Sequence, residues 1–224
     1  MTYQPAALSC DLNTLPQLPV WVTSGRVETL ETVAFRSGAA LTMLDQLVSD
    51  PRHGVPKQLL ANRLALSAAT ATSKLEGRSA READIRDAYH LTPPGEACGP
   101  DGDLLGFWRG AARLRVMGRD WHTDLKDLVG PRFEDDVVGW LASGADRVRT
   151  HGPIAGSVSV MRAVLEADDR AERIACLLSD IVLARALNWT TILPLTAQNL
   201  TKAMLCDLIV DCLLYTSPSP RDRG

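Results

Sequence analysis

The stretch RAERIACLLSDIVLARALN, residues 170–188, is predicted to form the most apolar helix of the chain. Ser179, Asp180 and Arg185 interrupt its apolar residues. The uninterrupted run is therefore well short of the roughly 20 apolar residues that span a bilayer. This segment predicts a helix of a protein that does not enter the membrane.

Further helices are predicted on the N-terminal side of this stretch, at residues 133–150 and 154–167 and around Leu104, Leu105, Trp108 and Ala112. No segment of the chain shows the sustained alternation of apolar and polar residues that a half-buried strand requires. We therefore expect an all-α protein, an irregular multi-helix bundle of about seven to nine helices.

Three N-terminal helices are predicted from their end signals. Ser24 is a plausible N-cap for the first, which Pro51 and Gly54 end. The second covers about residues 56–76, and Gly77 terminates it. The pattern S-x-x-E formed by Ser79 and Glu82 predicts a capping box for a short third helix.

The distribution of Pro and Gly predicts the domain organisation. Residues 1–20 are expected to be an irregular lead-in, and residues 21–91 an N-terminal helical group. The segment TPPGEACGPDGD, residues 92–103, is predicted to be loop, followed by a C-terminal helical group over residues 104–211. We expect the two groups to form one domain.

Residues 212–222, CLLYTSPSPRD, resemble the translation of the transposase mosaic-end adapter used in shotgun sequencing. The resemblance implies that residues 212–224 are adapter-derived, that the chain is a truncated metagenomic fragment and that its gene continues past Asp211. The alternative is a natural disordered tail rich in Ser and Pro.

The overall charge gives no reason to expect nucleic-acid binding. The 24 Lys and Arg residues are outnumbered by 27 Asp and Glu residues, which gives a formal net charge of −3, whereas binding to phosphates needs a surplus of basic residues on one face. The five cysteines lie far apart, and no secretory segment follows Met1. Free thiols in the cytoplasm are the simplest interpretation.

The common catalytic signatures are missing, including GxSxG, GxxxxGK[ST], GxGxxG and HExxH. The four histidines are scattered singly, and His90 with Cys98 is the nearest approach to a pair of zinc ligands. No second pair completes such a site, so we predict neither a metal nor a cofactor. A non-enzymatic role is preferred, and an enzyme stays open.

Asp180 is the one acid surrounded by large apolar residues, and burial there would require a partner. Arg173 lies seven residues earlier, about two turns away on the same helical face. We expect Asp180 to occupy a partly exposed edge position or to form a structural ion pair, with a functional site as the alternative. Glu134, Asp135 and Asp136 are expected in the first turn of a helix, where the helix dipole favours acids.

The segment TSKLEG, residues 72–77, resembles the inhibitory helix of Fic-domain nucleotidyl transferases. That resemblance would make Thr72 the first motif position and Glu76 the acid that pairs with a catalytic arginine. The chain lacks the HxFxxGNGR catalytic loop of that family. We therefore prefer a helix end with a solvated Glu76 and with Gly77 as its cap.

Four segments together resemble the bacterial family catalogued as domain of unknown function 1403. They begin at Pro19, Ala61, Arg81 and Leu177, and TSGRVETLE with RDAYHLTPPG carries the most specific part. The resemblance implies a bacterial setting and no mechanism. We expect a non-enzymatic module that acts through a protein partner, DNA-linked through a missing C-terminal segment. The alternative is an enzyme or enzyme regulator related to Fic proteins.

Overall fold

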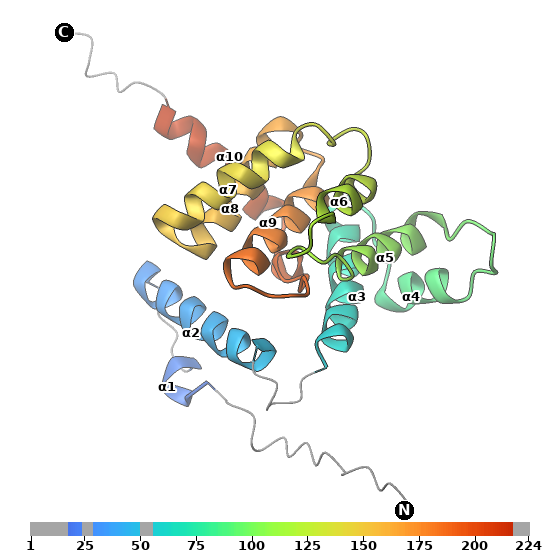
Figure 1. Ribbon diagram of the computed structural model, residues 1–224, viewed down its shortest axis with the longest axis horizontal. Coiled ribbons are helices and arrows are strands. Elements are labelled where there is room, and N and C mark those ends of the chain that lie inside the picture. The colour runs from blue at the N-terminus through green and yellow to red at the C-terminus, as the bar shows by residue number, and fades with distance from the viewer. Residues whose placement is uncertain (1–17, 24–28, 50–55, 217–224) are drawn as a thin grey trace, which may run out of the picture. The chain divides into compact units, whose positions relative to one another are not determined.

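The computed structural model describes residues 18–23, 29–49 and 56–216 of the chain (Figure 1). This part holds nine helices of nine residues or more, the single-turn helix α1, the 3-10 helix η3 and no strand. The structure thus confirms the predicted all-α multi-helix architecture. Among the described residues, no helix has the combination of length and apolar composition that a membrane span needs.

The helices follow one another as α1 (Val20–Thr23), α2 (Leu30–Ser49), α3 (Lys57–Leu75), α4 (Glu82–His90), α5 (Gly99–Ala111), α6 (Trp121–Val129), α7 (Val137–His151), α8 (Pro153–Ala167), α9 (Glu172–Ala186), η3 (Thr196–Asn199) and α10 (Lys202–Thr216). The chain divides into two compact units, Met1–Lys57 and Gln58–Gly224. The first contains α1 and α2. All the sites below belong to the second, as does the loop between α4 and α5.

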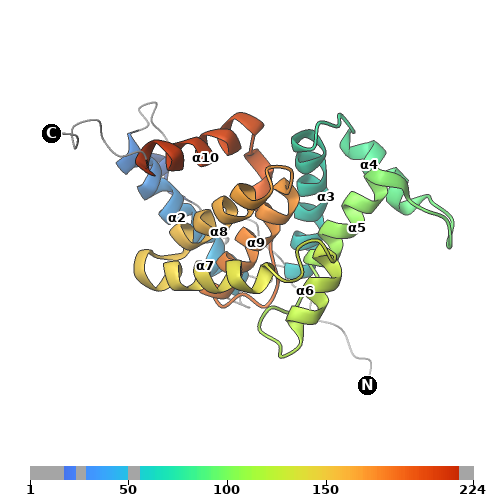
Figure 2. The same ribbon diagram turned by 90° about the horizontal axis from the view of Figure 1, so that it is seen from above.

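Helices α7, α8 and α9 form the centre of the second unit and lie side by side in both views (Figures 1 and 2). The α8 and α9 backbones approach closely through two small residues. Ser157 Oγ donates to the Ser179 carbonyl oxygen at 2.8 Å, and Ser179 Oγ donates to the Ser157 carbonyl oxygen at 2.9 Å. Because each buried hydroxyl donates to the backbone carbonyl of the other serine, the two polar side chains are satisfied at the helix crossing.

Helix α3 buries small residues and ends where the sequence predicted. Gly77 has a φ of +77°, the left-handed conformation that favours glycine. The Arg78 N–H donates to the Ser73 carbonyl at 2.8 Å and the Gly77 N–H to the Lys74 carbonyl at 3.1 Å, which is the pattern of a Schellman cap. The prediction that Gly77 terminates this helix is confirmed.

The capping prediction for α4 was wrong. This helix begins at Glu82, and Arg81 is its N-cap rather than Ser79. Asp84 Oδ2 accepts the Arg81 backbone N–H at 3.3 Å and also the Arg81 Nε–H at 3.1 Å. An acid that serves both groups of Arg81 moves the start of the helix two residues along the chain. Ser24, the other predicted cap, lies outside the described residues.

Two other boundaries differ from the sequence prediction. The loop expected over residues 92–103 ends at Cys98, because α5 starts at Gly99 with Pro100 in its first turn, a position that tolerates the missing proline N–H. Glu134, Asp135 and Asp136 precede α7 rather than filling its first turn, since α7 starts at Val137.

Helices α6 and α10 were not among the predicted elements. In α6, Trp121, Leu125 and Val129 are buried at intervals of four, so one face of this short helix enters the core. Helix α10 runs past Asp211 to Thr216. The rest of the expected adapter-derived tail, residues 217–224, lies outside the described residues.

Candidate functional site

Thr72 supports the core of the second unit. Its side chain is fully buried. Its Oγ1 donates to the Ala68 carbonyl at 2.8 Å and accepts the indole N–H of Trp108 at 3.0 Å. Since Trp108 is also fully buried, Thr72 supplies the acceptor that a buried indole N–H requires.

Glu76 is not solvated, so that expectation was wrong. Only 18% of its side chain is exposed. Its Oε1 lies 2.9 Å from Arg173 Nε, and its Oε2 lies 2.5 Å from Arg78 Nη2. The first turn of α9 brings Arg173 beside the end of α3. The acid therefore has arginine partners within its own chain, where the sequence analysis expected none.

Asp180 is not at an exposed edge, and it forms no ion pair with any residue that the structure describes, so both expectations for it were wrong. It is 1% exposed, and its Oδ1 accepts the backbone N–H groups of Leu195 and Thr196 at 3.2 Å and 3.0 Å. Arg173 points to Glu76 instead. Burial raises the pKa of the Asp180 carboxyl to about 8, although the hydrogen bonds from Thr196 and Leu195 oppose this rise. Asp180 thus connects α9 to the start of η3 through hydrogen bonds.

The three candidate residues do not assemble into one site. No hydrogen bond or ion pair of the described residues joins Thr72, Glu76 and Asp180 to each other. His90 lies beside Arg109, with 3.1 Å between His90 Nε2 and Arg109 Nη1. The described part of the chain contains no group of three His, Cys, Asp or Glu residues that could hold a metal ion.

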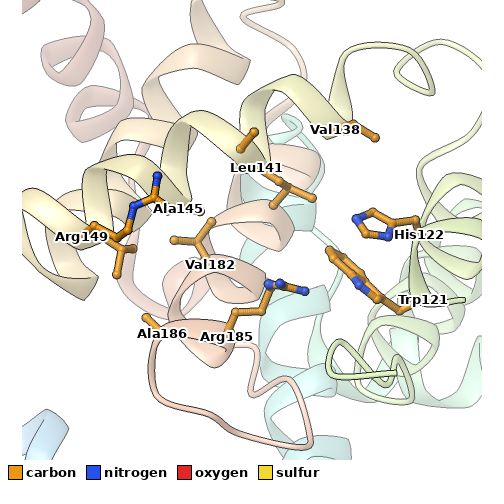
Figure 3. Close-up of a pocket in the computed structure, with 11 residues that line it drawn as sticks. Trp121, His122, Val138, Leu141, Ala145, Arg149, Val182, Arg185 and Ala186 are labelled. Carbon is orange, nitrogen blue, oxygen red and sulfur yellow. The ribbon is translucent and has the colours of Figure 1, made fainter. Parts of the chain in front are cut away.

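An apolar pocket of about 370 Å³, the Trp121 pocket, lies between α6, α7 and α9 (Figure 3). Trp121 and His122 at the start of α6 border it, with Leu141 of α7 and Val182 of α9. The rest of its lining is Val138, Ala142, Ala145, Val148, Arg149, Arg185 and Ala186. Trp121, Leu141 and Val182 are all buried, so part of the pocket wall is formed by buried apolar side chains.

Cationic side chains stand at the edge of this pocket. The guanidinium carbon of Arg185 lies 4.9 Å from the Trp121 ring centroid, and Arg185 Nη1 donates to the Val116 carbonyl at 2.9 Å. The His122 ring lies 3.9 Å from the Trp121 ring, centroid to centroid. Figure 3 draws Arg149 at the opposite end of the pocket from Trp121. The pocket therefore combines an apolar interior with an edge of basic side chains.

This pocket was not predicted from the sequence because α6 was not among the expected helices. The signal that could have found α6 is the spacing of Trp121, Leu125 and Val129, behind Asp120 and ahead of Gly130. The other two walls were expected as helices. Their convergence on Trp121 depends on contacts between distant segments, which periodicity does not reveal.

Comparison with curated proteins and comparison with solved structures each gave no match. The alternative of a relation to Fic-type nucleotidyl transferases therefore has no support from them. The model of one family, described as Protein of unknown function (DUF1403), matches residues 6–211. That match covers most of the chain, and the chain therefore belongs to the DUF1403 family.

Proposed function

We propose that this chain is a non-enzymatic protein-binding module. Its Trp121 pocket receives one large apolar side chain from an extended partner segment that carries acidic residues on either side of it. The observation that carries the proposal is the buried apolar wall of the pocket joined to a basic edge. No assembled catalytic group borders the pocket in the part of the chain described.

The apolar anchor follows from the size and lining of the pocket. A volume of about 370 Å³ lies at the small end of ligand pockets, which run from about 300 to 1,000 Å³. It fits one or two large side chains rather than a whole helix. Buried aromatic and aliphatic contacts of this kind supply most of the affinity in small interfaces.

The acidic flanks follow from the donors at the edge. Arg185 uses Nη1 for the Val116 carbonyl, which leaves further guanidinium N–H groups for a carboxylate. Arg149 is exposed and pairs with Asp146, its neighbour on α7. Such exposed groups raise the association rate and select partners of opposite charge more than they raise affinity.

The proposal includes the setting expected from the sequence. The partner is a protein, the compartment is the bacterial cytoplasm and this chain does not itself bind nucleic acid. The scattered positions of the cysteines support the reducing compartment. The net charge of −3 argues against a nucleic-acid partner.

Selection of random peptides displayed against the 224-residue chain tests the proposal. We expect the enriched peptides to share a large apolar residue with Asp or Glu within a few positions of it. Ala145→Phe, on the pocket lining, should fill the cavity and abolish binding. Ser143→Phe is the matched control, because Ser143 is exposed on the same helix and outside the lining. Enrichment of basic peptides, or equal binding to both variants, would reject the proposal.

A further inference from the structure

A second pocket of about 240 Å³, the arginine pocket, lies between the end of α3, helix α5, the end of α6 with the segment after it, and the start of α9. Three arginines line it, Arg132, Arg170 and Arg173. Two carboxylates, Glu76 and Asp168, line it as well. The cations therefore outnumber the anions by one, in contrast to the whole chain, in which acids outnumber bases.

Two of these arginines each contact a carboxylate and an aromatic ring. Arg173 Nε lies 2.9 Å from Glu76 Oε1, and its guanidinium carbon lies 5.0 Å from the Phe107 ring centroid. Arg132 Nη2 lies 2.5 Å from Asp168 Oδ2, and its guanidinium carbon lies 5.3 Å from the ring centroid of the adjacent Phe133.

Each guanidinium carries five N–H donors, and a single carboxylate contact leaves several of them unused. Arg173 can therefore donate to a ligand while Glu76 and Phe107 hold it in position, and Arg132, whose side chain is 70% exposed, can reach the same ligand from beside Asp168. A donor that is already oriented loses less entropy when a ligand binds.

Arg170 provides the charge that no acid of the pocket neutralises. Its backbone N–H donates to Asp168 Oδ1 at 3.1 Å. Its exposed guanidinium forms no ion pair with any residue in the described ranges. The ion pairs of Arg132 and Arg173 serve to connect α3, α9 and the segment before α7, but that role does not explain a third arginine on the same lining.

We infer that the arginine pocket binds the phosphate group of a small phosphate monoester. A phosphate presents three terminal oxygens in different directions, which suits three guanidinium groups supplied by two parts of the chain, the segment before α7 and the start of α9, whereas a carboxylate presents two oxygens in one plane. The pocket volume of about 240 Å³ accommodates the phosphate with a small substituent. This site is separate from the Trp121 pocket, so the inference does not depend on the proposed function.

Titration of the full chain with methyl phosphate, inorganic phosphate and acetate at equal ionic strength tests the inference. Binding is followed by calorimetry and by the NMR signals of the arginine Nε–H groups. We expect methyl phosphate to bind at least as tightly as inorganic phosphate and both to bind more tightly than acetate. Arg170→Gln should weaken the binding of methyl phosphate by about tenfold, which is the effect of losing one charged hydrogen-bond donor.

Arg147→Gln is the matched control, since Arg147 is an exposed arginine of α7 outside the pocket lining. The affinity of the Arg147→Gln variant for methyl phosphate should stay within about twofold of the affinity of the unsubstituted chain. The inference is overturned if acetate binds as well as phosphate, if inorganic phosphate alone binds, or if Arg170→Gln and Arg147→Gln have equal effects. Because Arg170 is exposed, Arg170→Gln should unfold at an unchanged temperature, so its loss of binding cannot come from misfolding.

Discussion

The crossing of α7 and α8 predicts a large effect from a single methyl group, Gly156→Ala. An ideal Cβ on Gly156 would lie 2.4 Å from Val148 Cγ2 and 2.8 Å from the carbonyl oxygen of Gly144. The second contact is with backbone, which cannot rotate away, so the two helices have to separate. Overpacking of this kind costs about 1–3 kcal/mol. Because one of the contacts is with a backbone atom, we expect a cost at the upper end of this range.

An opposing term comes from helix propensity, because alanine is more favourable than glycine in a helix by about 1 kcal/mol. The net expectation for Gly156→Ala is a fall of about 2 kcal/mol in the free energy of unfolding. Gly139→Ala is the matched control, since Gly139 lies in α7 and a Cβ there would meet nothing within 4 Å. It should raise stability by up to about 1 kcal/mol.

Urea denaturation followed by circular dichroism measures both changes. A Gly156→Ala variant as stable as the unsubstituted chain would refute the close helix crossing. An equal destabilisation in both variants would show that glycine at these positions serves some purpose other than backbone approach.

Three further predictions concern the residues singled out in the sequence. The pKa of Asp180 is raised to about 8 in the folded chain, against about 3.9 in an unfolded chain. Between these two pH values the folded state keeps a proton that the unfolded state loses, so the free energy of unfolding should fall as pH rises from about 4 to about 8. Asp180→Asn should flatten this fall in urea denaturation, and an unchanged pH profile would contradict the prediction. Glu76→Ala should lower the free energy of unfolding by about 1–2 kcal/mol, because it leaves the partly buried Arg173 without a carboxylate and leaves Arg78 with Asp101 alone; a loss below about 0.5 kcal/mol would mean that the glutamate is solvated after all. Thr72→Val should lower stability by about 1–3 kcal/mol by leaving the buried Trp108 indole N–H without an acceptor, whereas Thr72→Ser should be close to neutral; equal losses would assign the effect to packing.

Local signals in the sequence predicted the parts of the fold that local chemistry decides. The apolar segment around Leu177 and Ile181 is a buried helix, and Gly77 caps α3 in a left-handed conformation. Both depend on neighbours within a few residues. The predicted start of α4 was wrong because two acids, Glu82 and Asp84, could each serve as the acid of the capping box. Which of them does so depends on the backbone N–H that each one reaches.

Contacts between distant segments could not be predicted in this way. Arg173 was considered as a partner for Asp180 on its own helix, yet it pairs with Glu76 of α3. Asp180 is bound by backbone N–H groups of the segment that follows α9. Both outcomes depend on how helices pack, and a single sequence carries no direct record of that packing. The arginine pocket was missed for the same reason.

The protein-binding role of the Trp121 pocket can be tested through the indole N–H signal of Trp121. The chain is labelled with ¹⁵N, and the Trp108 and Trp121 indole signals are assigned from single substitutions to Phe. The tightest peptide from the display selection is then added to saturation. We expect the Trp121 signal to shift in step with binding, while the signal of Trp108, which is fully buried against Thr72, stays in place. A Trp121 signal that does not move at saturation would contradict it.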